Sequence, residues 1–327
     1  MEESMANDTH KVEVVRVSIE SHPNADRLDV ARIFGFTCCV AKGSFKDGQL
    51  GAYVQPDSVV DSTRPEFEFL AGHERIRVKK LRGVVSMGLL LPAPKGAQEG
   101  DDLAEHFGVT HYEPPIPGER CGEVEGGPVG IYAPKYDVES MYRYKRLFAD
   151  GEPVVATEKI HGANSRFVFA PGEDRMYCGS RGEWKAPNPS DIWWKVLDRN
   201  PWIEEFCRAN PGDILYGEVF GNVQSLKYGA GPGETFFRAF DVLRNGVWRE
   251  MGEIVGVSLN LDQWVPIVYE GPFGFDALVK LSDGPSLIPG ANHTREGIVV
   301  RPIPERTDPH QGRVHLKLVG NTYLEKA

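Results

Sequence analysis

The sequence predicts an α+β protein in two parts, a small N-terminal β-barrel followed by a larger domain of strands and helices. Short apolar runs separated by turns fill residues 11–94, which is typical of a barrel. Residues 92–134 are rich in Gly, Pro and acids and predict a connector. The rest alternates strand and helix patterns, and 327 residues with 41% hydrophobic content suffice for two cores.

The N-terminal part contains five short apolar runs that we interpret as strands. They are Val12–Val17, Leu28–Ile33, Cys38–Ala41, Gly51–Val54 and Met87–Leu91. Five strands in about 80 residues predict a small barrel, and an OB-fold is the most economical choice. We expect a disordered N-terminus at 1–10, the barrel domain at 11–110 with a short helix near 102–107, a linker at 111–134, and the second domain at 135–327.

The second domain opens on a strand, a tight turn and another strand. Pro153–Thr157 and Ser165–Phe169 are apolar, and Gly162-Ala163-Asn164 turns between them, so Lys159 lies at a strand end. A lysine there could act as a nucleophile if its amine were neutral. A lone Lys-x-His-Gly match is more commonly an exposed strand-end lysine. Further along, Ser190 to Cys207 predicts a helix interrupted at Pro201, with its tryptophans in the core rather than exposed for stacking on a ligand.

Further short elements follow Lys159-Ile160-His161-Gly162 in a fixed order. They are Ser180-Arg181-Gly182, Tyr216-Gly217-Glu218, Phe240-Asp241, Arg295-Glu296-Gly297 and Leu316-Lys317-Leu318. This ordered set resembles motifs I, Ia, III, IIIa, IV and V of the covalent nucleotidyltransferases, the superfamily of ATP-dependent ligases and capping enzymes. The resemblance implies antiparallel sheets with flanking helices. Each motif is weak alone, and the order makes the set specific.

The resemblance also implies a role for each matched residue. Lys159 takes AMP from ATP as a covalent adduct, Lys317 contacts the α-phosphate, and Glu218 and Glu296 complete the catalytic set. The residues expected around the nucleotide are Glu158 at the adenine amino group, Gly162 where the backbone approaches phosphates, His161 donating to an oxygen or supporting the turn, Arg181 at ribose or phosphate, Phe240 stacked on adenine, and Asp241 bracing the fold around it.

Glu218 and Glu296 form the expected metal site. Each stands in or beside an apolar strand, where a carboxylate is costly unless a cation or hydrogen bond satisfies it. Because Mg²⁺ takes few carboxylates and keeps several waters, two acids fit hydrated Mg²⁺, or Mn²⁺. Read singly, the acids could be solvated strand ends and Phe240 a core residue. Relatives carry a second lysine near Lys317; here His315, Arg301 or Arg313 is the candidate replacement.

The N-terminal part narrows the class further. Three segments resemble a group of ATP-dependent RNA ligases with an N-terminal OB domain. They are Glu20 to Leu28, which contains His22-Pro23-Asn24; Lys79 to Leu89; and Lys135-Tyr136-Asp137. The chain ends ten residues after Lys317, so we expect no C-terminal OB domain of the kind found in DNA ligases and capping enzymes. The resemblance implies sealing of RNA 3'-OH to 5'-phosphate ends, as in nick repair of RNA-containing duplexes.

A basic segment in the barrel is the expected RNA contact. The chain is acidic overall, with 37 Lys and Arg against 47 Asp and Glu, so local patches must bind RNA. On one strand, alternate members of such a segment would face a phosphate backbone together. Lysines that protect a strand edge are the alternative. The predicted RNA-binding residues are Arg75, Arg77, Lys79, Lys80 and Arg82.

Composition bounds the remaining possibilities. No apolar run is long enough to span a membrane, and five cysteines without Cys-x-x-Cys spacing indicate reduced thiols in a cytoplasmic protein, in a host cytoplasm if the source is viral. We expect ATP and RNA as partners, no protein partner, and a monomer. The alternatives are a DNA ligase, a GTP-using capping enzyme, or a non-catalytic RNA-binding protein. Retention of Lys159, Glu218, Glu296 and Lys317 argues against decay.

Overall fold

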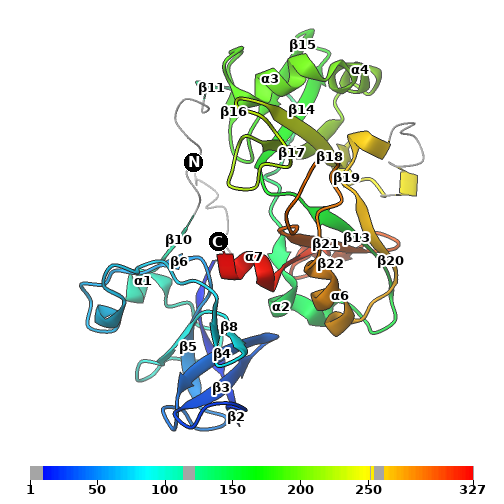
Figure 1. The fold of residues 1–327 in the computed structure, drawn as a ribbon. Helices are drawn as coiled ribbons and strands as arrows, with labels where there is room; N and C mark the ends of the chain where they lie inside the picture. Colours follow the sequence, from blue (N-terminus) through cyan, green and yellow to red (C-terminus); the bar gives the residue numbers. More distant parts are fainter. Residues whose placement is uncertain (1–9, 113–121, 251, 254–260, 327) are drawn as a thin grey trace. The chain divides into compact units, whose positions relative to one another are not determined.

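The computed structural model describes residues 10–112, 122–250, 252–253 and 261–326, and they form two compact units (Figure 1). The first unit comprises the described residues up to 112 together with 141–145 and 321–326, and the second comprises the rest. The predicted disorder at 1–9 and part of the predicted linker, 113–121, lie outside the described residues. No helix in the described part is long and apolar enough to cross a membrane.

The first unit is built from short antiparallel strands. One sheet has the order β1-β5-β9 and another the order β2-β3-β4, with two small two-stranded sheets beside them. The strands are β1 (Val12–Arg16), β2 (Ser18–Ser21), β3 (Leu28–Ile33), β4 (Phe36–Ala41), β5 (Leu50–Val54), β6 (Ser58–Val59), β7 (Lys79–Leu81), β8 (Val84–Ser86), β9 (Leu89–Pro92) and β10 (Thr110–His111). All five predicted strands are present, with ends shifted by at most two residues.

The core of this unit explains why the apolar runs become strands. Val12 of β1 and Ala52 and Val54 of β5 are buried in one core with Phe67 and Phe107, and Tyr53 is buried as well. A short apolar run that is buried along most of its length is typical of a strand inside a small barrel. Helix α1 (Ala104–Phe107) lies where the sequence predicts a short helix and contributes Phe107, and the 3-10 helix η1 spans Glu68–Leu70.

The predicted basic strand is only partly a strand. Residues Lys79–Leu81 form β7, which pairs with β8 through a turn at Arg82 and Gly83, both with positive φ. Residues 75–78 alternate in burial, with Ile76 and Val78 buried, yet only Arg75 makes an isolated bridge, to Val59. A continuous strand over 75–82 is therefore wrong, because the chain leaves the sheet ladder before Lys79.

Two sheets form the second unit. The larger has the order β11-β16-β15-β14-β17-β18-β19 and the smaller β12-β24-β21-β13-β20. In the larger sheet the strands are β11 (Val124–Glu125), β16 (Trp184–Lys185), β15 (Arg175–Gly179), β14 (Ala163–Ala170), β17 (Ile214–Gly221), β18 (Thr235–Arg244) and β19 (Val247–Trp248). In the smaller sheet they are β12 (Glu139–Ser140), β24 (Leu316–Val319), β21 (Gly297–Pro302), β13 (Pro153–Lys159) and β20 (Ile267–Pro272).

All pairs in these sheets are antiparallel except β12 with β24. A hairpin of β22 (Thr307–Asp308) and β23 (Gly312–Arg313) adds to them. Among the described residues, the helices of this unit are α3 (Ile192–Arg199), α4 (Pro201–Ala209) and α6 (Phe275–Ser282), with the 3-10 helix η4 (Leu261–Gln263). Helices α2 (Met141–Tyr144) and α7 (Asn321–Lys326) belong to the first unit, and the 3-10 helix η3 spans Lys145–Leu147. An α+β fold of mainly antiparallel sheets with flanking helices is confirmed.

Helices α3 and α4 support the larger sheet. Asp191 caps α3 by accepting hydrogen bonds from the Trp193 and Trp194 amides, and Pro201 starts α4, where its missing N–H costs nothing. Trp193 is 1% exposed and packs with residues of β14, β17 and β18. The core interpretation of this tryptophan is confirmed, and the helix pair fixes the strands that carry the site.

Candidate active site

Lys159 ends strand β13 at the edge of a buried sheet. Strand β21 runs beside β13 with Gly297 opposite Lys159, so the preceding residue, Glu296, lies next to the lysine. Lys159 Nζ is 2.5 Å from Glu296 Oε1, and His161 Nδ1 is 3.3 Å from Glu296 Oε2. Lys159 and His161 therefore both contact the carboxylate of Glu296, which is far from them in the sequence.

The turn after Lys159 brings Glu218 to the same place. A Cβ on Gly162 would lie 2.2 Å from the Val219 carbonyl oxygen, so only glycine fits this close approach. Strand β14 then pairs with β17, and Asn164 lies directly opposite Glu218. The pairing of β14 with β17 thus sets Glu218 beside the lysine strand.

The two carboxyl groups have opposite pKa shifts. Desolvation by burial raises the pKa of Glu218 to about 8, although Lys159 acts to lower it, and the negative charge of Glu296 raises it further. Burial also acts to raise the pKa of Glu296, but the positive charge of Lys159 and hydrogen bonds from His161 and Lys159 hold it at about 2. Glu296 is therefore the ionised partner of Lys159, and Glu218 is mostly protonated at neutral pH.

The oxygen atoms around Lys159 fit a divalent cation. Glu218 and Glu296 supply carboxylates, and Asn164 Oδ1 is buried without a hydrogen-bond partner. Mg²⁺ and Mn²⁺ take such oxygen ligands and keep several waters. The described residues hold no cluster of three or more His, Cys, Asp or Glu with metal-binding geometry, so a cation here would rely on water and substrate oxygens.

Glu158 lies behind the lysine on β13. Its side chain is buried and accepts hydrogen bonds from Ser286 Oγ at 2.6 Å and Leu287 N at 2.7 Å. Burial raises its pKa, and these hydrogen bonds oppose the shift. Both oxygens already have a protein donor, so an adenine amino group would be an additional donor to this carboxylate.

Phe240 and Asp241 lie side by side on β18 in different surroundings. The ring of Phe240 is partly exposed and lies 4.6 Å from that of Tyr136, centre to centre. Asp241 is fully buried and accepts from Tyr136 Oη at 2.6 Å and Arg313 Nη1 at 2.5 Å. Arg301 Nη1 is 3.3 Å from the same carboxylate. Asp241 therefore ties together strands around Phe240.

Lys317 lies on the same face of the smaller sheet as Lys159. It is opposite Val299, which is opposite Thr157, and side chains directly opposite in a sheet share a face. Lys159 is two residues from Thr157 and shares that face. Among the candidates for a second cation, Arg301 and Arg313 bind Asp241, while burial and these arginines lower the pKa of His315 to about 3. His315 is neutral at pH 7.

Arg181 follows β15 and is exposed. Its Nη1 is 3.1 Å from Asp137 Oδ1, which belongs to the Lys135-Tyr136-Asp137 element. Tyr136, of the same element, hydrogen-bonds Asp241. The structure thus joins this short element to two of the later ones.

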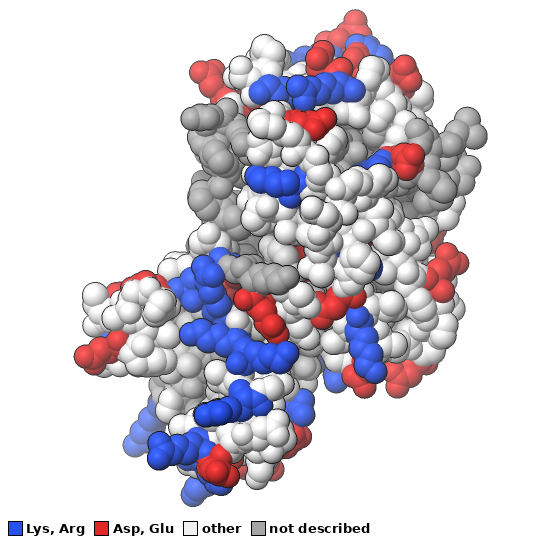
Figure 2. All heavy atoms as spheres, viewed as in Figure 1, with Lys and Arg blue, Asp and Glu red and all other residues white. Residues whose placement is uncertain are grey.

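The basic residues of the first unit form an exposed surface (Figure 2). Arg77, Lys79 and Arg82 are exposed, Lys80 lies 3.6 Å from Glu325, and Arg75 is bound to Asp57 at 2.7 Å. His22 Nε2 lies 3.1 Å from the Leu81 carbonyl oxygen, and Asn24 donates to that of Arg82. The His-Pro-Asn loop therefore supports the basic hairpin, which is a contact that the sequence did not reveal.

Three residues of the Lys159 site were not predicted. Asn164 faces Glu218, Tyr228 Oη accepts the His161 amide at 2.7 Å, and Ser286 holds Glu158. Asn164 could have been predicted from the sequence, since it is one of the first residues of the strand that follows the Gly162 turn. Tyr228 and Ser286 are in distant loops with no pattern that marks them.

The fold and the site together describe an α+β protein of two units in which a lysine at a strand end lies beside two glutamates. The sequence profile of the RNA ligase family matches residues 152–319, and the profile of an OB-fold domain matches residues 11–93. The chain belongs to the RNA ligase family, and its N-terminal unit has the predicted OB-fold. This result favours an RNA ligase over the DNA ligase and capping-enzyme alternatives.

Solved structures of Naegleria gruberi RNA ligase are similar over nearly the whole chain. A mutant with ATP and Mn has a TM-score of 0.82 and 25% sequence identity, covering 96% of this chain and 98% of that chain. The same ligase with PPi has a TM-score of 0.82 and 26% identity, covering 97% and 98%. A mutant with AMP and Mn matches with 25% identity and a TM-score of 0.82, covering 97% and 99%. No curated protein matches the chain.

Proposed function

We propose that this RNA ligase joins RNA 3'-OH and 5'-phosphate ends with ATP through an AMP bound covalently to Lys159. The observation that carries the proposal is the strand-end lysine held 2.5 Å from buried Glu296, with Glu218 on the neighbouring strand β17. The similar Naegleria ligase was solved with ATP, with AMP and with PPi, the substrate and products expected of such an adenylylation.

In the first step, Lys159 attacks the α-phosphorus of ATP. A nitrogen–phosphorus bond forms, the bond to pyrophosphate breaks, and the amine loses a proton. The lysine must therefore leave its ion pair with Glu296 as a neutral amine. A divalent cation held by Glu218, Glu296 and Asn164 would neutralise charge on the phosphates and favour that neutral amine.

Other residues of this chain orient the nucleotide and the phosphates. Lys317 projects from the lysine face of the sheet and neutralises the α-phosphate, and Gly162 lets the backbone approach phosphate oxygens. Phe240 offers a ring to adenine, and Glu158 accepts from its amino group. His161 and Arg181 bind phosphate or ribose oxygens, while Asp241 holds Phe240 in place.

The second and third steps move AMP and then release it. AMP passes from Lys159 to the RNA 5'-phosphate, which frees the amine and forms a phosphoanhydride. The 3'-OH then attacks the adenylylated phosphate, the phosphodiester forms, and AMP leaves. Both steps are nucleotidyl transfers that depend on positioning and charge neutralisation, so the same cations serve all three.

The substrate that we propose is a nicked or gapped duplex with an RNA 3'-OH strand, bound in part by the basic surface of the OB-fold. Arg77, Lys79 and Arg82 are exposed there, as contacts with phosphates require. The adenylyltransferase domain spans 135–327 in this proposal, and the protein acts as a monomer.

Labelling with α-labelled ATP and Mg²⁺ tests the lysine. We expect a covalent label on the wild type that Lys159→Ala removes to the detection limit, because no other amine occupies the strand end. Glu205→Gln, which changes an exposed residue of α4, is the matched control and should label normally. Persistent labelling of Lys159→Ala, or preferential labelling by GTP, would contradict the proposal.

Charge reversal tests the basic surface. Deleting the barrel would strip partners from 141–145 and 321–326, which cluster with it, so point changes are sharper. In Arg77→Glu with Lys79→Glu, we expect normal Lys159 labelling but nick-sealing with an RNA KM raised about tenfold or more, since each lost phosphate contact weakens binding. The KM should depend less on salt than in wild type. An unchanged KM would show that these residues only solubilise the barrel.

A further inference from the structure

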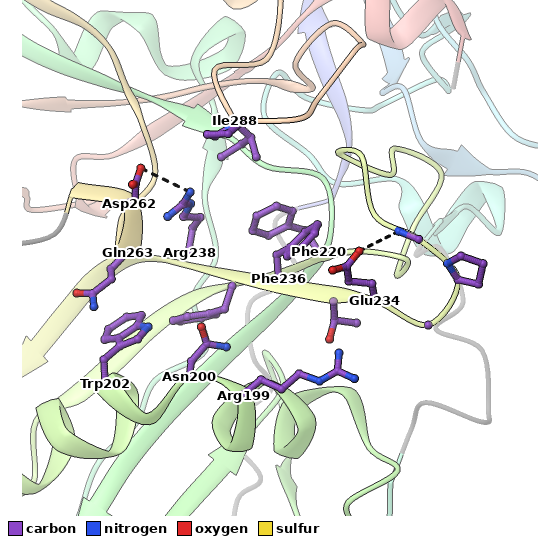
Figure 3. A pocket seen from close by; sticks show the side chains of 16 residues that line it. Arg199, Asn200, Trp202, Phe220, Glu234, Phe236, Arg238, Asp262, Gln263 and Ile288 are labelled. Carbon is purple, nitrogen blue, oxygen red and sulfur yellow. Dashed lines mark hydrogen bonds and ion pairs between the residues drawn. The ribbon is translucent and has the colours of Figure 1, made fainter.

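The second unit contains a pocket of about 870 Å³ next to the proposed adenylylation site. Figure 3 shows strand β18 crossing it, with Arg199, Asn200 and Trp202 from the α3–α4 junction on one side. Asp262, Gln263 and Ile288 lie on the other side. None of the residues predicted to bind ATP or metal lines this pocket.

Unsatisfied polar groups in the pocket indicate a ligand. Strand β18 pairs with β17 along one edge, but no strand of the described chain pairs with its other edge between Thr235 and Arg238. The hydroxyl Oγ1 of Thr235 is buried without a hydrogen-bond partner. Buried polar groups are rarely left unpaired, so this edge is suited to a ligand that brings donors and acceptors.

The side chains favour a nucleotide over a peptide. Trp202 and Phe236 are partly exposed aromatic rings, on which a base can stack. The Arg238 side chain is 15% exposed, and within the described part of the chain its ion pair is a long one, 4.0 Å, with Asp262. Asn200, whose Nδ2 donates to the Val196 carbonyl oxygen at 2.8 Å, and Gln263 also line the pocket. A peptide strand added to the β18 edge would need none of the rings or the guanidinium.

The position of the pocket connects it with the chemistry. Arg238 is the direct cross-strand partner of Glu218, so their strands are about 4.8 Å apart. A nucleotide in the pocket therefore lies one strand from the carboxylate that we assign to the metal. We propose that the pocket seats a nucleotide of the RNA strand being joined, with its base on Trp202 or Phe236 and its phosphate at Arg238. This rests on the proposed sealing function.

Two separate assays of the full chain test the pocket. The variants are Arg238→Gln and Trp202→Leu, with Arg208→Gln, an exposed arginine of α4, as the matched control. Lys159 labelling by ATP in the absence of RNA should be unchanged. Sealing of a nick that already carries 5'-adenylylated RNA, without ATP, should show an RNA KM raised on the order of tenfold. RNA with 4-thiouridine beside the junction should crosslink to residues 199–202 or 235–238.

Each outcome of these assays supports or contradicts the assignment of the pocket to an RNA nucleotide. An unchanged RNA KM in Arg238→Gln together with crosslinks elsewhere would overturn the proposal, and a raised ATP requirement for labelling would assign the pocket to ATP instead. If Trp202→Leu loses its melting transition, Arg238→Gln decides alone. Failure of the proposed function is distinguishable, since the wild type itself would then show no label and no sealing.

Discussion

The second unit holds two buried ionic clusters that differ in charge balance. The Asp241 cluster contains Asp241 and Glu305 with Arg301 and Arg313, two acids with two permanent cations. The Lys159 cluster contains two acids, Glu218 and Glu296, with one lysine, Lys159, beside His161. One cluster is neutral as built, while the other has an acid in excess.

The pKa values follow this difference. Burial acts to raise the pKa of Asp241, but Arg301 and Arg313 outweigh it and the pKa is lowered. In the Lys159 cluster the single cation holds only Glu296 ionised, and Glu218 keeps its proton up to about pH 8. Removing one member of the balanced cluster would leave an uncompensated buried charge, whereas the divalent cation that we propose would complete the other cluster.

The largest expected effect on stability comes from breaking the balanced cluster. Asp241→Asn leaves Arg301 and Arg313 buried with one acid, and removal of one member of a buried ion pair costs about 3–5 kcal/mol. We expect that loss in urea unfolding of the full chain. Lys159→Ala should cost far less, because the 26% exposed lysine side chain leaves Glu296, which can take up a proton.

The control for Asp241→Asn is Asp198→Asn, a change of an exposed residue of α3. A loss below about 1 kcal/mol in Asp241→Asn, similar to a surface change, would mean that the Asp241 cluster is not structural. The distinction between the two clusters would then fail.

The sequence predicted the Lys159 cluster better than the Asp241 cluster. Lys159, Glu218 and Glu296 stand in short elements whose order is informative, and the Gly162 turn fixes the register that joins them. Arg301 was interpreted as a candidate phosphate contact, yet it is 1% exposed. Its partner Asp241 lies sixty residues earlier, and only the pairing of distant strands shows that the arginine is buried.

In the N-terminal barrel, too, local patterns were predicted correctly and long-range contacts were not. Its five apolar runs predicted strands because a short apolar run between turns is a local pattern. The basic segment was extended too far as a strand, since charge alone does not report where a ladder ends. The contact of His22 and Asn24 with the hairpin is a long-range hydrogen-bond pair, which no local pattern encodes.

A smaller effect, and the sharpest test of the comparison, is the pH dependence of the Lys159 cluster. The folded pKa of Glu218 is raised to about 8 from its ordinary value of 4.5, so the folded state holds a proton that the unfolded chain releases. The stability from this proton is complete below pH 4.5 and is lost as pH rises through 8. For Glu296 the sign is opposite, and its contribution is lost only as pH falls toward 2.

Between pH 5 and 8.5 the difference in melting temperature between wild type and Glu218→Gln therefore measures the protonation of Glu218. In EDTA, the wild-type melting temperature should fall more steeply with pH than that of Glu218→Gln, and the curves should separate upward of pH 5. Mg²⁺ should restore the wild type most at high pH, where the carboxyl is ionised, and should act little on the variant. Glu205→Gln should follow the wild type throughout. Parallel curves for wild type and Glu218→Gln would show that Glu218 is ionised in the folded protein without a metal, so that its pKa is not raised and the two clusters do not differ in this respect.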